Sequence, residues 1–218
     1  MIIKNIIFDL GVVVLNIDYN GPANVLKSMG VDNFEVYYSK AKQSNLFDDF
    51  EKGLISPDDF RESFKESIEI IISNAEVDGI WNAMILDFPA KRIELLKALK
   101  NNYRTFLLSN TNKIHYDFYT KRLNDENGVS WDDLFHKTFF SFEIGLRKPD
   151  HQIYLKALEE AEIDAAESLF IDDLFINAEA SKACGINTVW LKEGIDMTTV
   201  FEKDISTNMM KPKKSLIL

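Results

Sequence analysis

The sequence is short of cysteine, and that shortage excludes several kinds of site. Its 218 residues include a single cysteine, Cys184, which cannot form a disulfide within the chain or build a zinc site from several thiolates. We expect Cys184 to pack as a small apolar residue on a core helix. The composition suits a reducing compartment, and we expect the cytoplasm. A chain of this length can bury a large core without disulfide or metal staples.

Positive charge and long apolar runs are also scarce. The 25 Lys and Arg residues face 35 Asp and Glu residues, so the formal net charge is −10. Such a charge disfavours nucleic acid and anionic membrane surfaces as partners. Lys4, Asn5 and Asp9 interrupt the apolar start, and no apolar run approaches the roughly 20 residues of a membrane span. We therefore expect a folded, soluble protein that binds neither nucleic acid nor membrane.

Short apolar runs alternate with helical patterns over most of the chain. Alternation of this kind predicts an α/β fold with a doubly wound, mostly parallel sheet. The expected strands are 2–8, 103–108, 138–140, 168–171 and 188–191, and the expected helices between them are 90–100, 113–123, 151–161 and 176–184.

The long segment after the first strand has a helical pattern. Ser56 and Pro57 are a good helix start, and Phe60, Phe64, Ile68 and Ile71 then recur at helical spacing. Such an insert would sit above the carboxyl ends of the strands, where open α/β sheets bind ligands. We therefore expect a small helical cap at 17–88 on a core of 1–16 and 89–218.

Polar residues follow the expected strands at the points where the strands end. Asp9 follows the first strand, Ser109 and Asn110 follow the second, and Asp172 and Asp173 follow a later one. The carboxyl ends of parallel strands share one sheet edge, so these side chains should converge there.

Lys148 and Pro149 precede a predicted helix, and the lysine should reach the same edge. Crowded carboxylates raise one another's pKa values, and a hard cation such as Mg²⁺ relieves their repulsion. A lysine and a hydroxyl beside that cation would hold a phosphoryl group, and backbone N–H groups at a helix start could add donors. An aspartate aimed at the phosphorus can act as a nucleophile.

Each of these segments is common by itself as a turn, a helix cap or a loop, and their order makes the combination specific. The runs Phe8-Asp9-Leu10-Gly11-Val12-Val13, Leu107-Leu108-Ser109-Asn110-Thr111-Asn112, Gly145-Leu146-Arg147-Lys148-Pro149-Asp150 and Phe170-Ile171-Asp172-Asp173 resemble the four motifs of the haloacid dehalogenase-like hydrolase superfamily. The helical insert stands where that superfamily has a small cap. The residues of these motifs are most similar to those of the superfamily's sugar-phosphatase branch, which includes α-D-glucose-1-phosphate phosphatase.

The resemblance implies a role for each phosphate-handling residue. Asp9 would be the nucleophile, and Lys148 would neutralise charge on the nucleophile and the phosphate. Ser109 and Asn110 would bind the phosphoryl oxygens. The phosphoryl group would pass through an aspartyl-phosphate, which water then hydrolyses.

The resemblance also implies a Mg²⁺ site. Asp9, Asp173 and the backbone carbonyl of Gly11 would bind the ion, and Asp172 would help directly or through water. Asn177 would support these ligands from behind.

One position departs from the resemblance. Most phosphatases of the superfamily carry a second aspartate two residues after the nucleophile, and Gly11 stands there. That group transfers protons, which is typically worth about 10²–10⁴-fold in rate. The substrate could need less help, as a sugar 1-phosphate does, or His115 or Asp18 could substitute. We favour a helix-surface position for His115. Alternatively, the chain has lost hydrolysis and kept ligand binding.

Other reactions of the superfamily fit less well. A haloacid dehalogenase also lacks the second aspartate but has a tyrosine where this chain has Gly11, and a mutase needs that aspartate. A phosphonate hydrolase uses a cap lysine, and Lys40, Lys42 and Lys52 lie in no apolar stretch that would lower their pKa values.

The sequence thus predicts a Mg²⁺-dependent phosphatase of a small phosphorylated metabolite, with a sugar phosphate such as glucose 1-phosphate favoured. The alternatives are a catalytically impaired binding protein of the same fold and a dehalogenase-type hydrolase. We expect a monomer or a homodimer, with 211–214 in a loose, solvated tail. Cap and linker aromatics are candidates to face a sugar, although core packing is the default for each: Phe47, Phe50, Phe60, Trp81 and Phe88.

Overall fold

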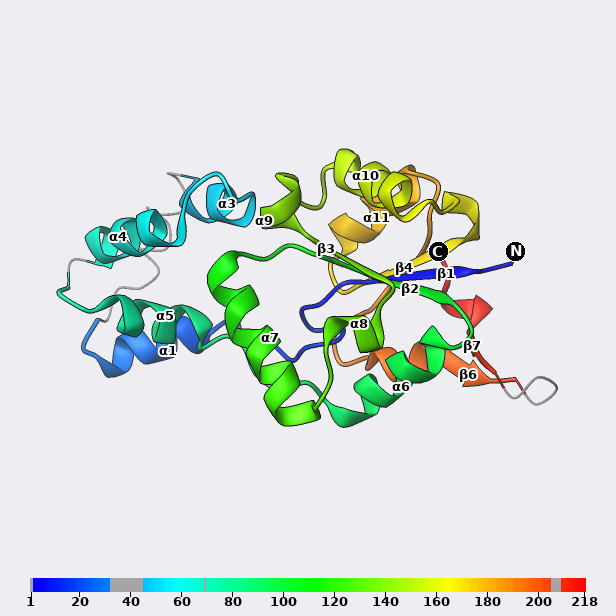
Figure 1. Cartoon of the computed structure of the whole chain (residues 1–218), viewed down its shortest axis with the longest axis horizontal. Coiled ribbons are helices and arrows are strands. Elements are labelled where there is room, and N and C mark those ends of the chain that lie inside the picture. The colour runs from blue at the N-terminus through cyan, green and yellow to red at the C-terminus, as the bar shows by residue number, and fades with distance from the viewer. Residues whose placement is uncertain (1, 32–44, 69, 205–208) are drawn as a thin grey trace.

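A parallel sheet of five strands forms the centre of the molecule (Figure 1). The computed structural model describes residues 2–31, 45–68, 70–204 and 209–218. The strand order is β3-β2-β1-β4-β5. This confirms the predicted doubly wound α/β fold. The strands are β1 (Asn5–Phe8), β2 (Arg104–Ser109), β3 (Lys137–Phe140), β4 (Ser168–Asp172) and β5 (Asn187–Trp190).

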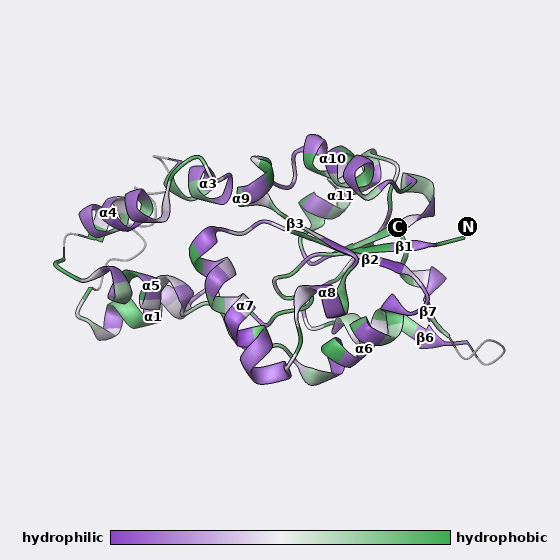
Figure 2. Ribbon diagram, viewed as in Figure 1, coloured by the Kyte–Doolittle hydropathy of each residue, from purple (hydrophilic) through white to green (hydrophobic). Residues whose placement is uncertain are grey.

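Successive side chains of each strand enter opposite layers of the core. Ile6 and Phe8 pack into one layer, and Ile7 packs into the other. Strands buried on both faces need apolar residues at every position, which explains their unbroken apolar runs. Figure 2 shows these strands as the hydrophobic centre of the ribbon, between more hydrophilic helices. One face carries α10 (His151–Ala161) and α11 (Phe175–Ala183), and the other carries α6 (Ala90–Lys100), α7 (Lys113–Asn127) and α8 (Trp131–Leu134).

The helices between β1 and α6 form a second body beside the sheet (Figure 1). Leu26, Phe60, Phe64 and Ile68 belong to its own apolar cluster. Ile71 was expected to extend this stripe, and that prediction is wrong, because α4 ends at Ile68 and Ile71 is fully exposed. The helices are α1 (Gly21–Ser28), α3 (Leu46–Glu51), α4 (Pro57–Ile68) and α5 (Asn74–Asn82).

Two antiparallel connectors join this helical body to the sheet. Asn16 N–H donates to the Asp87 carbonyl (2.9 Å), and Leu86 N–H donates to the Asn16 carbonyl (3.0 Å). Asp18 N–H donates to the Met84 carbonyl (2.9 Å). We propose that these connectors are the boundaries of a cap at 17–88.

The C-terminal segment is held against the core. β6 (Phe201–Lys203) pairs antiparallel with β7 (Met210–Pro212), and Tyr103 donates its hydroxyl to the Met210 carbonyl (3.0 Å). The final residue, Leu218, donates its N–H to Thr188 of β5 (2.8 Å). The predicted loose tail at 211–214 is therefore wrong. The remaining short elements are α9 (Ser141–Ile144) and the 3₁₀ turns Ala165–Glu167, Met197–Val200 and Lys214–Leu216.

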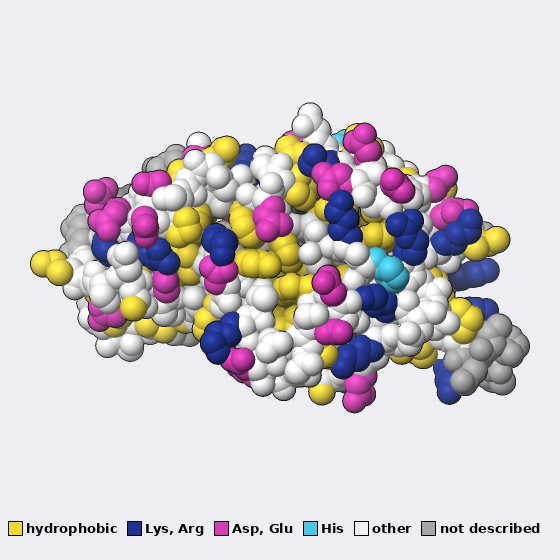
Figure 3. Space-filling view, viewed as in Figure 1, with side chains coloured by type: hydrophobic (Ala, Val, Ile, Leu, Met, Phe, Trp, Pro, Cys, Tyr) yellow, Lys and Arg dark blue, Asp and Glu magenta, His cyan; other side chains and the backbone are white. Residues whose placement is uncertain are grey.

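Charges of both signs are interspersed on the face seen in Figure 3. None of the helices in the described segments has the length and hydropathy to cross a membrane. Cys184 follows α11 and is half-buried against the core layer, as a small apolar residue would be. Lys40 and Lys42 lie outside the described residues.

Candidate active site

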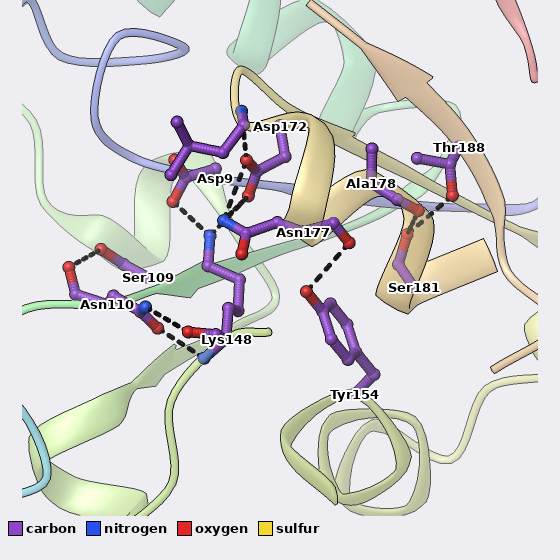
Figure 4. A network of polar contacts seen from close by, with 11 residues as sticks. Asp9, Ser109, Asn110, Lys148, Tyr154, Asp172, Asn177, Ala178, Ser181 and Thr188 are labelled. Atoms are coloured by element: carbon purple, nitrogen blue, oxygen red, sulfur yellow. Dashed lines mark hydrogen bonds and ion pairs between the residues drawn. The ribbon is translucent and has the colours of Figure 1, made fainter. Parts of the chain in front are cut away.

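The polar residues at the strand ends meet at one edge of the sheet (Figure 4). Asp9 follows β1, Ser109 ends β2, and Asp172 ends β4. β1 pairs with both β2 and β4, so their carboxyl ends must lie side by side. Lys148 reaches this edge from the loop before α10.

Lys148 bridges two of the carboxylates. Its Nζ lies 2.6 Å from Asp9 Oδ1 and 2.7 Å from Asp172 Oδ2, and the residue is only 2% exposed. Burial opposes the ammonium charge, but the attraction of Asp172 and Asp9 outweighs it, so the pKa of Lys148 lies above its usual value. The edge therefore carries a fixed positive charge beside Asp9.

Asn110 holds the backbone of Lys148. Its Nδ2 donates to the Lys148 carbonyl (2.9 Å), and its Oδ1 accepts from the Lys148 N–H (2.8 Å). The structure gives the Asn110 side chain this positioning role. The residue also lines the cavity described below, and its binding of phosphate stays a prediction. Ser109 is buried and lines the cavity described below, and among the described residues its hydroxyl makes only a long contact, with the Asn110 carbonyl (3.4 Å). Its hydroxyl is thus available to a ligand.

The two adjacent aspartates have different surroundings. Asp172 is fully buried and accepts hydrogen bonds from Lys148, the Leu174 N–H (2.8 Å) and Asn177 Nδ2 (3.1 Å to each oxygen). These bonds fix the position of the Asp172 carboxylate, and Asn177 supports it from α11. Asp173 lines the cavity. Burial and then the nearby Asp172 raise the pKa of Asp173 to about 6.

Trp190 supports Asp173 from behind. Its indole Nε1 donates to the Asp173 carbonyl (3.0 Å), and its ring lies edge-on to Phe175, with centroids 5.0 Å apart. The sequence assigned Trp190 no function. A tryptophan on the neighbouring strand β5 gives no sequence signal for a bond to a backbone carbonyl.

The three aspartates form a donor set suited to Mg²⁺. One carboxylate oxygen each of Asp9, Asp172 and Asp173 lies within 4.8 Å of the others, and Lys148 is the cation among them. Burial raises the pKa of Asp9 to about 7, against the attraction of Lys148. Such crowded, desolvated oxygens are ligands that a hard cation prefers. The Gly11 carbonyl accepts a hydrogen bond from the Val13 N–H (2.6 Å). A carbonyl oxygen has two lone pairs, so the second one could bind a metal ion.

A cavity of about 290 Å³ lies over these residues, between the sheet edge and the helical body. Phe47 and Trp81 line it, whereas Phe50, Phe60 and Phe88 are buried in apolar clusters and do not. The lining also includes Asp9, Gly11, Tyr19, Glu51, Ser109, Asn110, His115, Arg147, Lys148 and Asp173.

The two proposed substitutes for the missing acid are unsuited to the task. His115 is buried, not on a helix surface as expected, because α5 covers it: it stacks on Trp81 (5.0 Å) and its Nδ1 contacts Asn82 Oδ1 (2.9 Å). Burial lowers the pKa of His115 to about 3, so the ring is neutral at pH 7. Asp18 accepts from the Asn20 N–H before α1 and does not line the cavity.

Glu51 and Arg147 also line the cavity, and the sequence did not single them out for any role. Arg147 lies beside Lys148 in one of the motifs, which is a local signal for its place. Glu51 gave no such signal, because its position depends on how the cap packs against the core.

The sequence pattern of the haloacid dehalogenase-like hydrolases matches residues 31–185. The chain belongs to this family. It is similar to the family enzyme BT-2542 of Bacteroides thetaiotaomicron, whose structure with magnesium and inorganic phosphate is 34% identical, covers 92% of this chain and all of that one, and gives a TM-score of 0.86. The D-ribitol-5-phosphate phosphatase of the same species is 25% identical over 89% of this chain and 94% of its own length.

A third relative has a different substrate. The sesquiterpene phosphatase astK of Aspergillus oryzae is 30% identical over 70% of this chain and 75% of its own length. The L-2-haloacid dehalogenase of Xanthobacter autotrophicus, at 16% identity and a TM-score of 0.61, shares the fold.

Proposed function

We propose that this hydrolase removes phosphate from a small hydroxylated metabolite, a phosphorylated sugar or sugar alcohol, with Asp9 as the nucleophile. Its relatives named as phosphatases support the class of phosphoric monoester hydrolases. The observation that carries the proposal is the buried bridge from Lys148 to Asp9 and Asp172 beneath the cavity. It neutralises one oxygen of Asp9 and leaves the other for attack.

Each residue of the site then has a task in phosphoryl transfer. An oxygen of Asp9 attacks phosphorus and the bond to the leaving oxygen breaks, which gives an aspartyl-phosphate and an alkoxide that takes a proton from solvent water. Water then attacks the phosphorus, the bond from phosphorus to Asp9 breaks, and inorganic phosphate, a proton and the free Asp9 carboxylate result. Lys148 and the Ser109 hydroxyl stabilise charge on the phosphoryl oxygens. Bound by Asp9, Asp173 and the Gly11 carbonyl, Mg²⁺ would neutralise further phosphate charge. Asp172 and Asn177 keep Lys148 aimed at the reacting atoms.

Two kinds of substrate within this class differ in their leaving groups. A sugar 1-phosphate such as glucose 1-phosphate has the better leaving group, which suits the absence of an acid at Gly11. A polyol phosphate such as ribitol 5-phosphate has the poorer leaving group but is the substrate named for a relative. Assays of both with Mg²⁺ would rank them.

Asp9→Asn tests the nucleophile. We expect turnover of 4-nitrophenyl phosphate with Mg²⁺ to fall by at least about 10³-fold, because an amide oxygen forms no stable acyl-phosphate. Asp18→Asn is the matched control, since Asp18 lies outside the cavity, and should keep its activity. Undiminished turnover by Asp9→Asn would refute the assignment.

A ligand-binding protein of the same fold is the second candidate, and Gly11 favours it. It would bind vanadate or beryllium fluoride tightly with Mg²⁺ yet hydrolyse no ester in a broad panel. Halide release from 2-chloropropionate tests the dehalogenase-type reaction.

A further inference from the structure

An ion-pair cluster joins the cap to the loop that carries Lys148. Asp48 and Glu51 lie one turn apart on α3, and both face Arg147 of the core. Arg147 Nη1 pairs with Asp48, and its Nη2 lies 3.0 Å from Glu51 Oε2. One guanidinium thus fixes the positions of two cap carboxylates next to the catalytic loop.

The two carboxylates have different surroundings. Glu51 lines the cavity above Asp9, and its Oε2 is buried without a well-aligned hydrogen bond among the described residues. Asp48 is half-exposed and lines a second hollow, beside Lys52 and Pro149, and is not among the residues that line the cavity. Only Glu51 can therefore meet a ligand of the cavity.

An acceptor in this position suits a ligand that carries a hydrogen-bond donor. A carboxylate only accepts hydrogen bonds, and its two oxygens have more lone pairs than the ion pair with Arg147 uses. The neighbouring cavity wall is largely apolar: Phe47, Trp81, Met84 and Ile85. Hydroxyl groups on the organic part of a phosphate ester would supply a donor to the Glu51 carboxylate.

We propose that Glu51 is a specificity-determining residue, which accepts a hydrogen bond from a hydroxyl of the leaving group and so selects polyhydroxylated phosphates. The inference rests on the proposed phosphatase function. Arg147 is the positioning residue that holds the Glu51 carboxylate in the cavity.

Proton donation by Glu51 is the competing role. Burial raises the pKa of Glu51 above its usual value, and the attraction of Arg147 offsets only part of this rise. The ion pair requires an ionised carboxylate, which accepts hydrogen bonds and cannot donate one. The geometry therefore favours recognition over acid catalysis.

The experiment compares Glu51→Met with Asp48→Asn on three substrates. Ribitol 5-phosphate carries hydroxyls, n-pentyl phosphate is similar in length without them, and 4-nitrophenyl phosphate has a good leaving group. We expect Glu51→Met to lower kcat/KM for ribitol 5-phosphate by about 10- to 100-fold, mostly through KM, as loss of a charged hydrogen bond does. The other two substrates should change by less than about 3-fold, and Asp48→Asn should leave all three near wild type.

Other outcomes overturn the inference. A parallel loss on n-pentyl phosphate would indicate acid catalysis or a disturbed site, and an unchanged value for ribitol 5-phosphate would remove the role. Glu51→Gln keeps the volume of the side chain and an acceptor oxygen, so it should lower kcat/KM by a smaller factor, and only for ribitol 5-phosphate. This variant tests the inference if Glu51→Met folds poorly. If the wild type hydrolyses none of the three esters, the proposed function fails instead.

Discussion

Gly11 is the residue at which this chain lacks a proton-transfer group beside the nucleophile. Within the part of the chain that the structure describes, a Cβ at this position would meet only Ile17 Cγ1, at 3.5 Å, which is an ordinary contact. Gly11 also lines the cavity. The site thus has room for a side chain at this position, so steric crowding does not explain why an acid is absent.

Gly11→Asp should therefore add acid–base catalysis. We expect kcat for n-pentyl phosphate to rise by about 10- to 100-fold, toward the range typical of general acids, because its alkoxide needs a proton to leave. Turnover of 4-nitrophenyl phosphate should change little, since nitrophenolate leaves unprotonated. Gly11→Asn is the control of equal size. Equal gains for both variants, or no gain for Asp, would contradict the argument.

At the scale of single residues, the sequence predicted the positions of the site residues that lie at the ends of strands. Asp9, Ser109 and Asp172 follow apolar strands, and parallel pairing brings them together. His115 and Glu51 could not be placed, because α5 buries the first and the packing of α3 on the core decides the second. No local pattern reports contacts between two bodies.

Among the elements, the loop from β2 to α7 combines two functions in neighbouring asparagines. Asn110 holds both backbone groups of Lys148, while Asn112 caps α7 by accepting the His115 N–H (3.0 Å). The first pair of bonds positions a catalytic lysine, and the second stabilises a helix.

Asn110→Ala and Asn112→Ala should separate these functions. We expect Asn110→Ala to lower kcat for 4-nitrophenyl phosphate by at least about 10-fold, because Lys148 loses its alignment with Asp9. Asn112→Ala should lower the free energy of unfolding by about 1 kcal/mol, the usual cost of a lost cap, with a smaller change in kcat. Urea denaturation and steady-state kinetics measure both effects. A loss of kcat as large in Asn112→Ala would mean that the loop acts as one unit.

The elements themselves were predictable where apolar periodicity was strong. The five core strands were expected within a few residues of their observed bounds. The β6–β7 pair was missed, because Phe201–Lys203 and Met210–Pro212 are short and each has a charged residue at its centre, which interrupts any apolar run. Their structure depends on pairing with each other and on the bond from Tyr103.

At the scale of the whole molecule, the active site concentrates part of the protein's negative charge. The chain has a formal charge of −10, and the buried cluster places three carboxylates around Lys148. The pKa values of Asp9 and Asp173, about 7 and about 6, lie above the usual value of 3.8. Without metal, the folded state thus binds protons more tightly than the unfolded state, and these two groups lose their stabilising effect as pH rises from about 4 to about 7.

Mg²⁺ should replace those protons, so its stabilising effect should grow with pH. At pH 8 and a Mg²⁺ concentration near 100 times Kd, we expect the free energy of unfolding to rise by about 2–3 kcal/mol. At pH 5.5 protonation of Asp9 should weaken binding by about tenfold or more and remove about 1.4 kcal/mol of this gain. Thermal unfolding at both pH values, with NaCl at equal ionic strength, separates site binding from screening of the net charge. Asp173→Asn should abolish most of the Mg²⁺ effect at pH 8. An equal rise in NaCl, or a larger Mg²⁺ effect at pH 5.5, would mean that the ion acts on the general charge of the protein and not at the sheet edge.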